Sequence, residues 1–109
     1  MTNAIERLYA ELLVRGADDE RHPRTAKLLS AGRSRIAQKL GEEALEVSLE
    51  VVQGNRDEVV HESVDLLYHL VVAWASMGIS PSEIWEEMAR REQMTGLAGK
   101  LPKGVEDPV

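Results

Sequence analysis

The sequence predicts an all-α protein, a small bundle of four to five helices. Apolar residues recur every three or four positions in successive segments, which is the period of an amphipathic helix. No segment shows the strict alternation of apolar and polar residues that is typical of a half-buried β-strand. Glycine or proline stands between most of these segments, where helices are expected to end or begin.

The first part of the chain predicts two short helices. Residues 3–15 have apolar positions at helical spacing, and residues 17–24 are rich in charge and contain a proline, which indicates a loop. Thr25 is expected to cap a short helix that ends at Ala31. The apolar positions of the first helix are Ile5, Leu8, Tyr9, Leu12 and Leu13.

The segment 34–53 predicts a longer helix with two apolar strips, which indicates packing on two sides. Gly41 lies inside it, at a cost of roughly 0.5–1 kcal/mol relative to alanine unless close packing or ligand approach requires it. The expected core stripe is Ile36, Leu40, Ala44, Val47 and Val51, and the second strip is Leu45, Leu49 and Val52. A polar line of Lys39, Glu43, Glu46 and Glu50 runs between them, with Glu42 at its margin.

The segment 56–77 predicts a helix that is apolar on most sides and therefore buried centrally. Asn55 with Glu58 resembles a capping arrangement at its start. One polar stripe survives on it, made of Glu62, Asp65 and His69.

Ser80 and Glu83 flank a first-turn proline and predict the start of a last helix. We expect one domain over 1–109, with its helical core at about 25–94 and an irregular tail at 95–109. So short a chain buries only a small core by itself, so we also expect a homodimer to complete the core, with a higher homo-oligomer as the alternative.

Composition excludes several classes of function. The formal net charge of -6 argues against nucleic-acid binding, and the absence of cysteine excludes disulfides, thiolate catalysis and cysteine-bound metals. The longest apolar run, 70–75, is too short to span a bilayer, and residues 1–15 carry charges that a signal peptide would lack. We therefore expect a cytoplasmic protein without a membrane partner.

Two acidic stretches, Gly41–Glu46 and Glu62–Asp65, predict a metal site. A tight turn between the two long helices would bring Glu43 and Glu46 opposite Glu62 and Asp65. Carboxylate oxygens suit hard divalent cations, so Mg²⁺ is the expected ion and Mn²⁺ the alternative. The competing interpretation is an acidic helix face that is merely solvated. The position of Glu62 and Asp65 on the most apolar helix disfavours that interpretation, because buried acids need partners.

Cationic and histidine side chains near these acids leave two interpretations open. Lys27, Arg33 and Arg35 form a solvated surface or bind phosphate, and Lys39 pairs with Glu43 or contacts a phosphate. His69 could hydrogen-bond Asp65 or be a satisfied core residue. The remaining ring residues are interpreted as structural, core or interface residues, namely His61, Tyr68, Trp74 and Trp85.

Two strings together resemble the phosphoribosyl-ATP pyrophosphohydrolases of histidine biosynthesis. The first is Lys39–Val47, which contains Glu-Glu-x-x-Glu, and the second is Glu62–Leu70, which contains Asp-Leu-Leu-Tyr-His-Leu. The string Thr25–Leu29 is similar too, and the resemblance covers 25–91. The combined acidic pattern also resembles the wider MazG-like nucleotide pyrophosphohydrolases.

This resemblance implies an all-α MazG-like fold, a homodimer, and Mg²⁺-dependent hydrolysis of phosphoribosyl-ATP to phosphoribosyl-AMP and pyrophosphate. It implies that Glu43, Glu46, Glu62 and Asp65 bind metal with Glu42 nearby, so that these five are the catalytic candidates. The substrate-binding candidates are Lys27, Lys39, Arg33 and His69.

The chain departs from the family pattern at two places. Pro23-Arg24 stands where family members often have Ser-Tyr, and the tail from Glu92 onward also differs. Two alternatives therefore stay open: a MazG-like pyrophosphohydrolase for another canonical or damaged nucleotide, and a non-catalytic helical dimerisation module.

Overall fold

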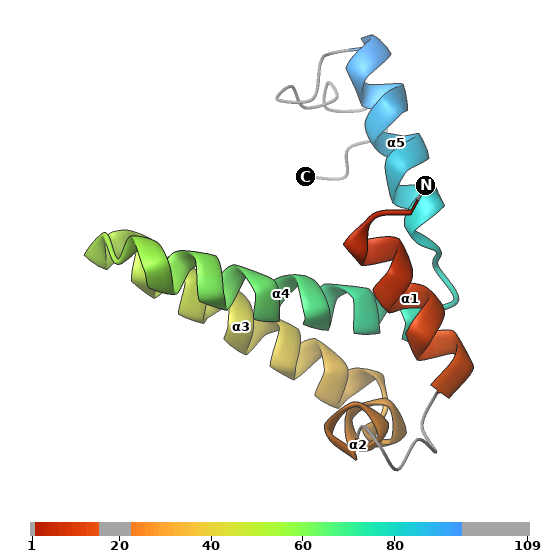
Figure 1. The fold of residues 1–109 in the computed structure, drawn as a ribbon, viewed down its shortest axis with the longest axis horizontal. Helices are drawn as coiled ribbons and strands as arrows, with labels where there is room; N and C mark the ends of the chain where they lie inside the picture. The colour runs from red at the N-terminus through yellow and green to blue at the C-terminus, as the bar shows by residue number, and fades with distance from the viewer. Residues whose placement is uncertain (1, 16–22, 95–109) are drawn as a thin grey trace. The chain divides into compact units, whose positions relative to one another are not determined.

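The structure, a computed structural model, describes residues 2–15 and 23–94, which form five α-helices and no strand (Figure 1). The predicted all-α fold is confirmed. The chain divides into two compact units, residues 1–79 and 80–109, which are described separately. The first unit contains α1 (Ala4–Arg15), α2 (Pro23–Ala31), α3 (Arg33–Gln53) and α4 (Arg56–Ser76), and the second contains α5 (Pro81–Met94).

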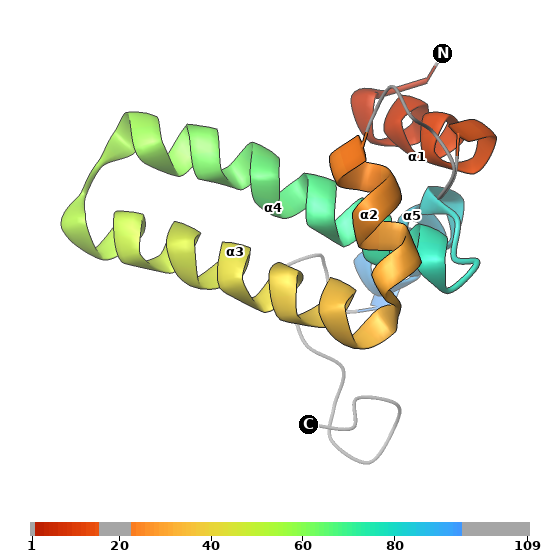
Figure 2. The same ribbon diagram turned by 90° about the horizontal axis from the view of Figure 1, so that it is seen from below.

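An antiparallel hairpin of α3 and α4 is the centre of the first unit, and the two helices run side by side in every view (Figures 1 and 2). Gly54 ends α3 at φ 72°, a left-handed conformation that favours glycine, and its N–H donates to the Val51 carbonyl at 3.1 Å. The predicted cap of α4 is wrong. The Asn55 side chain makes no capping bond and donates instead to Glu50 at 2.8 Å.

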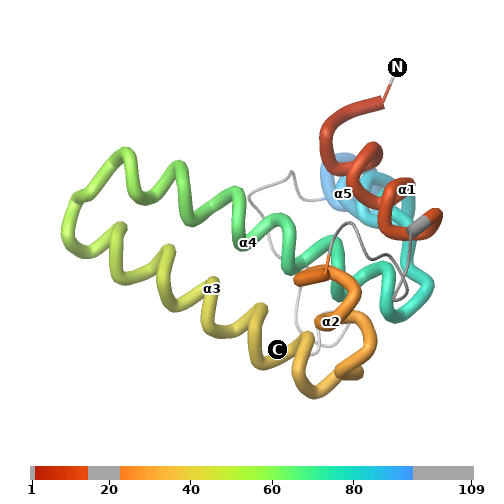
Figure 3. Tube along the Cα trace, turned by 60° about the horizontal axis from the view of Figure 1, so that its bottom comes forward, coloured from red at the N-terminus to blue at the C-terminus, as the bar shows by residue number. Residues whose placement is uncertain are grey.

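The hydrophobic core lies at the end of the hairpin that holds the start of α3 and the end of α4. Here α1 crosses α4 and α2 packs on α3, as the Cα trace shows (Figure 3). Burying these side chains supplies the main driving force that holds the four helices together. The buried residues are Leu12, Leu28, Ile36, Val71 and Val72.

The starts of the first two helices differ from the sequence expectation. Asn3 and Glu6 form a reciprocal capping box at α1, in which the Glu6 N–H donates to Asn3 Oδ1 at 2.8 Å. α2 begins at Pro23, so the expected cap at Thr25 is wrong. Proline tolerates the first helical turn because its missing N–H has no partner there. Thr25 instead hydrogen-bonds the Tyr68 hydroxyl.

The prediction that α4 is buried on most sides is wrong for its first half. Two apolar stripes face away from the partner helix within the hairpin and are exposed by 45–84%. The expected core position Val51 is also 59% exposed, and Ala44 is exposed. The outer stripe of α3 is Leu45, Leu49 and Val52, and that of α4 is Val60, Val64 and Leu67.

The second unit begins as the sequence predicts. The Ser80 N–H donates to Glu83 Oε2 at 3.0 Å, and α5 starts at Pro81. Within α5, hydrogen bonds from Arg90 and Arg91 lower the pKa of Glu87 to about 2. The expected irregular tail lies outside the described residues.

In the part of the chain that the structure describes, no single helix has both the length and the apolar character needed to cross a membrane, and only α4 and α5 taken together meet the length and composition test.

Candidate functional site

Acidic residues of α3 lie near acidic residues of α4 across the hairpin, because the charges of Glu43 and Glu46 act on Glu62. Glu43 of α3 and Glu62 and Asp65 of α4 are half-buried, whereas Glu46 is exposed. Burial raises the pKa of Glu62, and the negative charges of Asp65, Glu43 and Glu46 act in the same direction. Glu62 is therefore close enough to the other three carboxylates to be repelled by them, and a bound cation would offset this repulsion. Glu43, Glu46, Glu62 and Asp65 are called the acidic group.

His61 joins two of these acids. One ligand atom each from His61, Glu62 and Asp65 lie within 4.8 Å of one another, so these three residues could hold a metal ion. Among the described residues, this close cluster contains two of the four predicted ligands and does not include Glu43 or Glu46. His61 is exposed rather than a core residue, so interpreting it as structural missed this arrangement. Its spacing of four residues from Asp65, which puts both on one helix face, is the signal that could have found it.

Glu42 lies beside the acidic group but has partners of its own. Gln38 Nε2 donates to Glu42 at 3.1 Å, and Lys39 Nζ lies 3.4 Å from its other carboxylate oxygen. The hydrogen bonds from Gln38 and Lys39 lower the pKa of Glu42. Lys39 therefore pairs with Glu42 and not with Glu43, the partner considered from the sequence.

His69 is fully buried between the acids and a cationic region. Its Nε2 lies 3.8 Å from Glu43 Oε1 and 3.4 Å from Arg24 Nη2, whereas no hydrogen bond joins it to Asp65, the partner considered from the sequence. Burial lowers the pKa of His69, so the imidazole is neutral near neutral pH. Its Nδ1 has no hydrogen-bond partner among the described residues.

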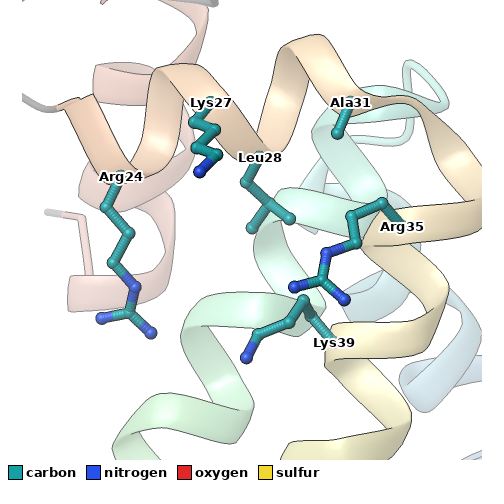
Figure 4. Close-up of a pocket in the computed structure, with 6 residues that line it drawn as sticks. All are labelled: Arg24, Lys27, Leu28, Ala31, Arg35 and Lys39. Carbon is teal, nitrogen blue, oxygen red and sulfur yellow. The ribbon is translucent and has the colours of Figure 1, made fainter.

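A pocket of about 240 Å³ between α2 and α3 collects cationic side chains (Figure 4). Of the sequence candidates, Lys27 and Lys39 line it and Arg33 does not, while Arg35 and Arg24 do. Sequence reasoning grouped Arg33 with Arg35 but could not separate them, because the choice depends on how α2 packs on α3. The full lining is Arg24, Lys27, Leu28, Ala31, Arg35 and Lys39.

The fold and this site define an all-α protein in which a group of carboxylates that could hold a cation lies beside a cationic pocket. Residues 6–92 match the model of the phosphoribosyl-ATP pyrophosphohydrolase family. The chain belongs to that family.

Named relatives agree with this assignment over most of their length. A phosphoribosyl-ATP pyrophosphatase 2 of Bradyrhizobium diazoefficiens is 50% identical over 96% of this chain and 78% of its own. The protein of the same name from Rhodopseudomonas palustris is 48% identical over 94% of this chain and 79% of its own. The phosphoribosyl-ATP pyrophosphatase of Gluconobacter oxydans is 44% identical over 94% and 77%.

Proposed function

We propose that this protein hydrolyses phosphoribosyl-ATP to phosphoribosyl-AMP and pyrophosphate, a step of histidine biosynthesis, with Mg²⁺ as its cofactor. The observation that carries this proposal is the acidic group beside a cationic pocket, in a chain that belongs to the family named for this reaction. The acidic group suits a metal and the cationic pocket suits phosphate, so the two together suit a metal-complexed nucleotide.

The residues present fit a hard divalent cation. Glu43, Glu46, Glu62 and Asp65 are the proposed ligands, with Glu42 nearby, and these five are the proposed catalytic residues. The raised pKa of Glu62 supports this choice, because burial and then the neighbouring carboxylates disfavour its charged form, and a cation would offset both effects. A bound Mg²⁺ would polarise a phosphate oxygen and lower the pKa of a water molecule. Mn²⁺ prefers the same oxygen ligands and is the alternative ion.

The substrate contacts predicted from the sequence are Lys27, Lys39, Arg33 and His69, of which His69 is fully buried and does not line the pocket. The first two are supported by the pocket, which both line, and the Lys39 ammonium lies 3.4 Å from Glu42. Arg33 lies outside this pocket, at the first turn of α3, and its role stays a prediction. Water would then hydrolyse the anhydride bond between the α- and β-phosphates while the cationic side chains hold the phosphate chain.

We also propose a cytoplasmic homodimer whose interface includes the outer stripes of α3 and α4. The α4 stripe continues, at helical spacing, into Val71, which is fully buried under α1. The same stripe is therefore covered at one end and open at the other, and a second copy would cover the open end. That residues 1–109 form one domain stays a prediction, which a single cooperative unfolding transition would support.

A substrate panel tests the activity. Purified protein with Mg²⁺ should release pyrophosphate from phosphoribosyl-ATP faster than from ATP or a damaged nucleoside triphosphate. Preferential turnover of one of the other nucleotides would support a nucleotide-pool enzyme and contradict the proposal. Metal binding without turnover of any substrate would indicate a non-catalytic helical module.

A further inference from the structure

Arg24 is a cation of the pocket that was not among the substrate-binding residues predicted from the sequence. It lies on α2 and lines the pocket with Lys27, Arg35 and Lys39. None of the lining residues is acidic. In Figure 4 the charged ends of Lys27, Arg35 and Lys39 point toward the space in front of Leu28, and the Arg24 guanidinium lies to one side of them.

These charges are only partly compensated. Lys39 has an ionic partner in Glu42, at 3.4 Å, whereas no ion pair joins Lys27 or Arg35 to another side chain within 2–15 and 23–94. Like charges gathered in one cavity repel one another, so an anion with several negative oxygens would be attracted there.

Arg24 is held in place by two aromatic side chains of α4. Its guanidinium carbon lies 5.5 Å from the centre of the Tyr68 ring, and its Nη2 lies 3.4 Å from His69 Nε2. A guanidinium can only donate, so we assign the acceptor role to Nε2 and the ring proton to Nδ1. The buried Nδ1 proton then has no partner among the described residues, a penalty that His69 carries while it holds Arg24.

We propose that Arg24 is a phosphate-binding residue of this protein, that it completes a four-cation site for a polyphosphate chain with Lys27, Arg35 and Lys39, and that His69 is its positioning residue. The proposal rests on the proposed function and deepens it. His69 Nε2 also lies 3.8 Å from Glu43 Oε1. A polyphosphate bound by Arg24 would therefore lie beside the acidic group, where the proposed reaction takes place.

The direct test measures binding of inorganic pyrophosphate to the full chain by calorimetry, with a chelator present so that no metal contributes. Arg24→Gln should weaken binding by about tenfold, the size of a lost charge-assisted hydrogen bond. Arg56→Gln removes the same charge from the far tip of the hairpin, where the Arg56 side chain is 87% exposed, and should change binding less than twofold. Equal effects of the two variants, or none, would overturn the proposal.

The role of His69 needs a second readout, because removing a buried side chain can also loosen the fold. His69→Ala should weaken pyrophosphate binding in the parent protein but add nothing in the Arg24→Gln background. His69→Gln should restore most of the affinity, since its amide oxygen can accept the Arg24 hydrogen bond. A loss with His69→Ala that is equal in both backgrounds would overturn the positioning role, while circular dichroism reports folding separately.

These experiments separate the inference from the proposed function. Binding of pyrophosphate through Arg24 without turnover of phosphoribosyl-ATP would refute the activity and leave the phosphate site standing. Turnover of phosphoribosyl-ATP with an unchanged KM in Arg24→Gln would refute the phosphate site and leave the activity standing.

Discussion

Replacing Leu49 by lysine should weaken association of this chain by one to two orders of magnitude. Leu49 lies in the middle of the outer stripe of α3 and is 47% exposed in the single chain. The six outer-stripe side chains together expose the equivalent of about three and a half complete side chains, so covering them is worth roughly 5–10 kcal/mol per protomer. Association itself costs about 4–15 kcal/mol. The net free energy of association is therefore small enough for one side chain to change it substantially.

The expected magnitude follows from the exposed fraction of Leu49. Covering the exposed half of one leucine contributes roughly 0.7–1.4 kcal/mol, and a symmetric dimer contains two copies. Losing both costs about 1.5–3 kcal/mol, or about a 10- to 150-fold rise in Kd, before the cost of burying an ammonium group is added.

Sedimentation equilibrium over a range of protein concentrations measures this effect. Leu49→Met is the matched control, because methionine has nearly the length of lysine but stays apolar, and it should associate like the parent. The reasoning is refuted if Leu49→Lys and Leu49→Met have the same Kd, or if the parent is monomeric at all concentrations.

Three further predictions concern the folded chain. Ile36→Ala, at a side chain only 2% exposed, should lower the free energy of unfolding in urea by about 2–5 kcal/mol, and a loss below about 1 kcal/mol would contradict its place in the core. Gly41→Ala should raise that free energy by about 0.5–1 kcal/mol, because nothing lies within 4 Å of the added Cβ, and a loss would show that Gly41 is needed for close approach. Burial and the neighbouring carboxylates disfavour the ionised form of Glu62 in the folded state and so raise its pKa above the usual 4.5. With a chelator present, stability should therefore fall as pH rises from 4.5 through that pKa, and Glu62→Gln should reduce the fall unless another group causes it.

Local sequence signals predicted the helices and one helix start well. Helical spacing indicated α3 and α4, and Gly54 stands where α3 ends in the left-handed conformation. Ser80 and Glu83 predicted the start of α5 because their partners lie within one turn. Asn55 shows the limit of such signals: the same side chain can bond backward to Glu50 as easily as forward to cap α4.

Tertiary packing decided the features that the sequence could not. The spacing of Val60, Val64 and Leu67 shows that one side of α4 is apolar, but it cannot show whether this chain or another copy covers that side. Likewise, the choice between Arg33 and Arg35 depends on where α2 lies against α3. The partners of His69 come from two other helices, so its spacing on α4 alone pointed to Asp65 and not to Arg24 or Glu43.

The central claim is that the acidic group binds the metal ion on which pyrophosphate release depends. Its most direct test compares Asp65→Asn with Glu58→Gln, which removes an exposed carboxylate from the same helix outside the acidic group. With phosphoribosyl-ATP and increasing Mg²⁺, we expect the Asp65 variant to stay folded and to lose at least about a hundredfold in kcat/KM, while the Glu58 variant matches the parent. Equal activity of the two variants at every Mg²⁺ concentration would contradict the account.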